Sequence, residues 1–133
     1  ARKESAFEVV SAQSAPVSPE ESAENLIGPG RYVFAPRGPN RIAFRSKDGG
    51  SVKLGGMSIF SDPEAGLALP RRVRITVSSQ ADGSQERLIL SGEFGPDGRF
   101  DRRLMQTTTR WIFVTVLNGW DVGPIGIEEV RFE

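Results

Sequence analysis

A run of nine residues near the carboxyl end, residues 109–117, constrains the fold of this chain most strongly. Its sequence, Thr-Arg-Trp-Ile-Phe-Val-Thr-Val-Leu, is almost entirely β-branched or aromatic. Such side chains favour the pleated conformation, and a continuous apolar run is typical of a strand covered on both faces. We therefore expect a strand in the middle of a sheet. A second apolar run, residues 125–132, follows a loop rich in Gly, Pro and Asn and predicts one closing strand.

The rest of the chain predicts short strands separated by turn residues. The clearest alternation places Val73, Ile75 and Val77 on one face of a half-buried strand. Further strands are expected at residues 6–11, 41–45, 51–60, 87–90 and 103–105, with one helical turn at 22–27 and a loop at 31–40. The Gly pair at 55–56 predicts either a β-bulge or a close approach of another backbone segment. About eight short antiparallel strands with almost no helical periodicity indicate an all-β sandwich or barrel.

Length and composition restrict the function. A chain of 133 residues can bury one substantial core, so we expect a single domain over residues 1–133. The 17 basic and 17 acidic residues cancel, so no overall field attracts nucleic acid, and no apolar run approaches the ~18 residues of a membrane span. The chain has neither Cys nor His, which excludes disulfides and removes the commonest general base and zinc ligand.

Enzyme chemistry is not expected. A Ser or Thr nucleophile would need Lys or a carboxylate as its base, because His is absent. The paired carboxylates at 20–21 and 128–129 are adjacent residues, and neighbours in a strand face opposite ways. The Arg clusters at 71–74 and 99–103 are interpreted as solvated faces.

Three segments, taken in order, resemble the discoidin-type (coagulation factor 5/8 C-type) family. They are the turn Asn25-Leu26-Ile27, the passage from Ser79 to Gly83, and the ending at 110–132 with its Ile-Gly-Ile-x-Glu-Val motif. The resemblance covers most of the chain. It implies a β-sandwich jelly roll of the galactose-binding-like class, with about eight antiparallel strands.

The resemblance also implies a ligand site in the loops at one end of the sandwich. Sugar recognition needs an exposed aromatic face flanked by groups that bind paired hydroxyls, and residues 118–121, Asn-Gly-Trp-Asp, contain that set. Trp120 has the alternative role of a plug in the end of the sandwich, whereas Trp111 is expected in the core. The predicted ligand-binding residues are Arg31, Tyr32, Arg37, Asp62, Glu64, Asn118, Trp120 and Asp121.

A calcium ion between the 25–27 turn and the Glu of the final strand, here Glu129, is a further implication of the resemblance. The Asp-Gly of the family is replaced by Gly28-Pro29 in this chain, so a side-chain ligand is missing. Calcium requires six to eight oxygen ligands. We therefore expect no cofactor, and Glu129 belongs either to a degraded calcium site or to the structure of that turn.

The function predicted first is a non-catalytic carbohydrate-binding module. The alternative is a protein-docking module that uses an Arg-rich sheet face with Arg72 and Arg74. A third hypothesis is phospholipid binding through Leu67 and Leu69. The expected partner is a glycan or a protein, with the chain as part of a larger protein or complex. The compartment stays open, although a glycan ligand favours an extracellular or cell-surface location.

Overall fold

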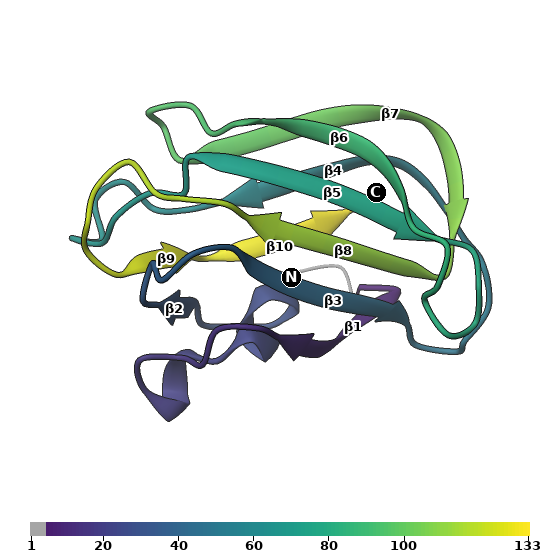
Figure 1. Ribbon diagram of the computed structural model, residues 1–133, viewed down its shortest axis with the longest axis horizontal. Helices are drawn as coiled ribbons and strands as arrows, with labels where there is room; N and C mark the ends of the chain where they lie inside the picture. The colour runs from purple at the N-terminus through teal and green to yellow at the C-terminus, as the bar shows by residue number, and fades with distance from the viewer. Residues whose placement is uncertain (1–4) are drawn as a thin grey trace.

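The computed structural model describes residues 5–133, which form ten strands and two short 3-10 helices (Figure 1). In chain order these elements are β1 (Phe7–Ala12), η1 (Pro19–Glu21), η2 (Ala23–Ile27), β2 (Tyr32–Phe34), β3 (Asn40–Ser46), β4 (Val52–Phe60), β5 (Arg72–Ser78), β6 (Arg87–Glu93), β7 (Arg99–Thr109), β8 (Trp111–Val116), β9 (Ile125–Ile127) and β10 (Glu129–Phe132).

The larger sheet has the strand order β1-β3-β8-β5-β6, so β8 is its middle strand. This confirms the position predicted from the apolar run at 109–117. Its inward residues are Ile112, Val114 and Val116, all at most 1% exposed, and they alternate with outward ones.

That alternation corrects the expectation for Trp111, which lies on the outer face of the larger sheet rather than in the core. Its indole ring stacks on Phe113 at a centroid distance of 5.7 Å, and its Nε1 donates to the Ala81 carbonyl at 3.0 Å.

The second layer is a three-stranded sheet of order β10-β4-β7, and β2 pairs with β9 in a separate two-stranded ladder. Figure 1 shows β4 and β10 lying behind β5 and β8. The register of β4 against β7 shifts between Leu54 and Gly56, which confirms the bulge predicted from the Gly pair.

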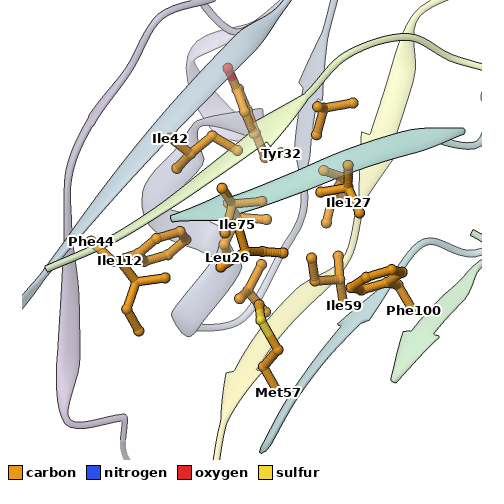
Figure 2. Close-up of a cluster of buried hydrophobic side chains, with 14 of the residues drawn as sticks. Leu26, Tyr32, Ile42, Phe44, Met57, Ile59, Ile75, Phe100, Ile112 and Ile127 are labelled. Carbon is orange, nitrogen blue, oxygen red and sulfur yellow. The ribbon is translucent and has the colours of Figure 1, made fainter. Parts of the chain in front are cut away.

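One apolar core fills the space between the layers. Figure 2 shows Ile42, Ile75 and Ile112 of the larger sheet facing Met57 and Ile59 of the smaller one. The strands are antiparallel throughout these sheets, so the all-β sandwich predicted from the sequence is confirmed.

Three predicted elements differ in extent. Tyr32–Phe34, expected within a loop, form β2, whose three residues are too few to show an alternation. The closing run at 125–132 is divided between β9 and β10, which pair with different partners, so one strand was the wrong prediction. Residues 103–105 belong to the much longer β7.

Among residues 5–133, no helix combines the length and the apolar character that a membrane crossing requires.

Candidate functional site

Two loops form a paired layer at one end of the sandwich, at the left of Figure 1. One loop, residues 117–124, joins β8 to β9, and the other, residues 61–71, joins β4 to β5. The Trp120 amide donates to the Leu69 carbonyl at 3.0 Å, and the Arg71 amide donates to the Asn118 carbonyl at 2.9 Å. These backbone bonds fix both loops before any ligand arrives.

Trp120 projects from this layer. The residue is 47% exposed, so about half of its surface is open to a ligand. The Arg71 guanidinium carbon lies 4.5 Å from the centroid of its ring, in cation–π geometry. Arg71 Nε also lies 3.7 Å from a Glu93 carboxylate oxygen, a distance too long for a hydrogen bond, and it has no hydrogen-bond partner.

A pocket of about 310 Å³ opens beside the same loop, within the ~300–1,000 Å³ range of small-ligand sites. Phe34, Pro36, Gly38, Val116, Leu117, Asn118, Gly119, Asp121, Val122 and Ile125 line it. Arg37 is exposed in the turn between two of these residues. The structure therefore places two of the predicted residues, Asn118 and Asp121, in the lining of one pocket, and Arg37 in a turn whose neighbouring residues line it.

Asn118 both shapes the loop and faces solvent. Its Oδ1 accepts from the Arg72 backbone amide at 3.1 Å, which holds the start of the loop against β5. Its Nδ2 group is not used by that bond, so an exposed amide donor stays available at the rim of the pocket.

Asp62 and Glu64 lie in the other loop and do not line the pocket. The Asp62 carboxylate accepts from the Glu64 amide at 2.9 Å, which closes a local turn. The structure thus places both residues in the paired loop layer, with Asp62 engaged in its own turn.

Tyr32 was wrongly predicted to contact a ligand, because it is 0% exposed. Its hydroxyl donates to the Ser14 carbonyl and accepts from Asn40 Nδ2 at 3.0 Å. Burial raises the pKa of the Tyr32 hydroxyl, while the bond from Asn40 opposes the change. Its place on β2, against β9, turns the ring into the core.

Arg31 is not brought to the site either. β2 and β9 pair with Tyr32 opposite Ile127 and Phe34 opposite Ile125. Arg31 therefore lies beyond the end of this ladder that is farther from loop 117–124. Its guanidinium is engaged there by Glu21, with Nε donating to Oε2 at 3.1 Å.

The apolar residues predicted as lipid contacts are only partly exposed, and Leu67 packs inward against Gly126. The exposed apolar tip is instead Val122, at 97%. Sequence reasoning also missed Arg71 as a neighbour of Trp120, since the pair meets only through the bonding of two distant loops and has no local signal.

Glu129, the predicted calcium ligand, begins β10. Its Oε1 accepts from Arg131 Nε at 3.1 Å and from Nη2 at 3.0 Å. Glu129 shares the wall of a second pocket, of about 680 Å³, with Leu26 and Ile27 of η2. Over residues 5–133, no group of three or more acidic side chains is arranged to hold a metal ion.

No protein-family model matches this chain, and no curated protein matches its sequence. Solved structures do match in fold. The family 32 carbohydrate-binding module of Streptococcus pneumoniae EndoD is 13% identical with a TM-score of 0.78, and the match covers 98% of this chain and 97% of that one.

Two similar structures contain a glycan. Clostridium perfringens CpGH89CBM32-5, in complex with GalNAc-β-1,3-galactose, is 18% identical with a TM-score of 0.77, over 95% of this chain and 94% of that one. Chitosan-binding module 2 of the Paenibacillus sp. IK-5 chitosanase/glucanase, in complex with chitotriose, is 13% identical with a TM-score of 0.76, over 97% and 95%. At these identities the similarity establishes the fold alone, the β-sandwich that this chain shares with these modules.

Proposed function

We propose that this chain is a non-catalytic carbohydrate-binding module whose ligand is held by the paired loop layer around Trp120. The observation that carries the proposal is the exposed indole ring on a loop whose backbone is already hydrogen-bonded to its neighbour. Carbohydrate-binding modules of the same fold, two of them with a bound glycan, support it.

The geometry suits a sugar ring. An aromatic face contacts the C–H groups of a pyranose, and donors and acceptors at its rim bind the hydroxyls. The guanidinium of Arg71, whose side chain is 43% exposed, and the exposed side chains of Asn118 and Asp121 offer both donors and acceptors. Because the loop is ordered in advance, little conformational entropy is lost on binding.

The pocket beside Trp120 gives room for a second unit or a substituent. Asp121 supplies a negative charge in its lining, the exposed Arg37 lies in the turn between two lining residues, and Val122 adds an exposed apolar contact. In this proposal the site binds its ligand by stacking and hydrogen bonding and catalyses no reaction. The protein-docking alternative gains no specific support, since the similar structures described above are carbohydrate-binding modules.

The test is retention on a glycan array that includes GalNAc-β-1,3-galactose and chitotriose as the first probes. The wild-type chain is expected to bind at least one glycan, and Trp120→Ala to lose most of that signal while its melting temperature changes little. Met105→Ala is the matched control, because Met105 is a 93% exposed apolar residue on β7, in the other sheet. Unchanged binding by Trp120→Ala would overturn the proposed site.

A further inference from the structure

The side-chain amide of Asn25 closes the turn around η2. Its Nδ2 donates to the Glu20 carbonyl at 2.7 Å and to the Arg31 carbonyl at 2.8 Å, so both amide hydrogens are used. The orientation of the amide follows from its neighbours, since two carbonyl acceptors require the nitrogen between them. The amide thus ties together the two ends of a turn that has no regular ladder.

Gly30 makes room for this contact. Its φ is +100°, and a Cβ at this position would lie 2.9 Å from Asn25 Cγ. Only glycine combines that backbone conformation with so close an approach. The Gly-Pro-Gly sequence after the turn therefore belongs to the same arrangement as the amide.

Arg31 supplies the positive charge of the turn. Its Nε donates to Glu21 Oε2 at 3.1 Å, and its Nη1 lies 3.8 Å from Glu128 Oε1. Glu21 is held in turn by the Ser18 hydroxyl at 2.9 Å. The Ser18 hydroxyl, and next Arg31, lower the pKa of Glu21. The guanidinium thus joins the turn to the segment between β9 and β10.

These contacts do not suit the calcium ion that the resemblance implies between the turn and the last strand. The ion would need six to eight oxygens directed at one point. Here an amide nitrogen lies between the two carbonyls, and a guanidinium lies between the two carboxylates. The oxygens of both groups are therefore engaged by groups of the chain itself, and Glu129, the carboxylate of the implied site, accepts from Arg131.

We propose that the Asn25 amide and the Arg31 guanidinium together do the structural work of a calcium ion, so that this turn folds and holds its shape without calcium. This inference is independent of the proposed glycan site, which lies at the other end of the β2–β9 ladder.

The first test uses thermal melting of the wild-type chain. Samples treated with EDTA, and then given either millimolar CaCl2 or the same concentration of MgCl2, are expected to melt at the same temperature within about 1 °C. A ligand present at about 100 times its Kd stabilises a protein by an amount that shifts Tm by several degrees. A rise of that size with CaCl2 alone, reversed by EDTA, would overturn the proposal.

The second test compares two Asn→Asp variants in the absence of calcium. Asn25→Asp replaces a donor with a carboxylate that faces two carbonyls, and we expect Tm to fall by about 6–10 °C or the fold to be lost. Asn118→Asp is the matched control, since Asn118 uses its oxygen as an acceptor, which Asp retains. Equal melting temperatures for the two variants would contradict the role of the Asn25 amide.

Discussion

Arg71 covers part of the indole of Trp120, with its guanidinium carbon 4.5 Å from the ring centroid. The two residues come from loops that meet only in the folded chain, and the backbone bonds between the loops set their distance. The pair joins an aromatic surface to a hydrogen-bond donor, the combination that sugar recognition requires.

Arg71→Ala is therefore expected to weaken glycan binding by about tenfold, as for the loss of one charge-assisted hydrogen bond. Stability should change by less than about 1 kcal/mol, because the Arg71–Glu93 ion pair is about 40% exposed on both sides. Isothermal titration with the glycan identified on the array measures the first effect, and urea unfolding measures the second. Arg74→Ala, an exposed Arg of β5, is the control; equal losses in the two variants would show a general charge effect.

Tyr32→Phe is expected to lower the free energy of unfolding by about 1–3 kcal/mol without changing glycan affinity. The change removes one hydroxyl and leaves the buried Asn40 Nδ2 and the Ser14 carbonyl without their partner. Urea unfolding of both chains measures the difference. A stable variant with impaired glycan binding would instead return Tyr32 to the ligand site.

The hydrogen bonds of the Glu86 carboxylate lead us to expect that the protein loses stability in acid. Arg41 Nη1 and Nη2 donate to its two oxygens at 2.7 and 2.6 Å, and the Thr76 hydroxyl donates to Oε1 at 2.7 Å. The Arg41 bonds, aided by Thr76, lower the pKa of Glu86 below its ordinary value of 4.5 in spite of the opposing effect of burial. A carboxyl whose pKa falls on folding stabilises the native state above its unfolded pKa, and that contribution disappears as the pH falls through the lower, folded value.

The stability advantage of wild type over Glu86→Gln should therefore be present near pH 7, at no more than about 1 kcal/mol, and should be lost as the pH falls below 4.5 and through the lowered, folded-state pKa of Glu86. Urea unfolding of both chains at several pH values measures it. An advantage that persists in acid would mean that the Arg41 contact contributes through packing on Phe113, whose ring centroid lies 3.9 Å from the guanidinium carbon.

Short sequence patterns predicted those strands and turns whose geometry depends on neighbouring residues in the chain. The structure confirms the middle position of the strand at 109–117, the alternation of Val73, Ile75 and Val77, and the bulge at the Gly pair 55–56. The cover expected on both faces of the first strand is not complete, because Trp111 and Thr115 on its outer face are only partly buried. β2 carries no such pattern, because its three residues are all buried and acquire strand geometry only by pairing with β9.

The candidate site divides in the same way. The segment Asn-Gly-Trp-Asp could be predicted as a ligand site from the sequence, because it combines an aromatic ring with polar groups. The residues that lie next to that segment could not be predicted, since Arg71 and the 36–38 turn approach it only when the loops pack together. Tyr32 and Arg31 were misplaced because an amino-acid type shows what a side chain can bind but not which face of the molecule it occupies.

The central claim, that Trp120 is the sugar-contacting ring, is tested most directly by the two indole N–H signals in the ¹H–¹⁵N NMR spectrum. The chain has two Trp residues, and Trp120→Phe assigns the signals by removing one of them. On titration with the glycan selected on the array, the Trp120 signal is predicted to shift while that of Trp111, bonded to the Ala81 carbonyl, stays in place. A shift confined to Trp111, or saturation of binding with the Trp120 signal unmoved, would contradict the account.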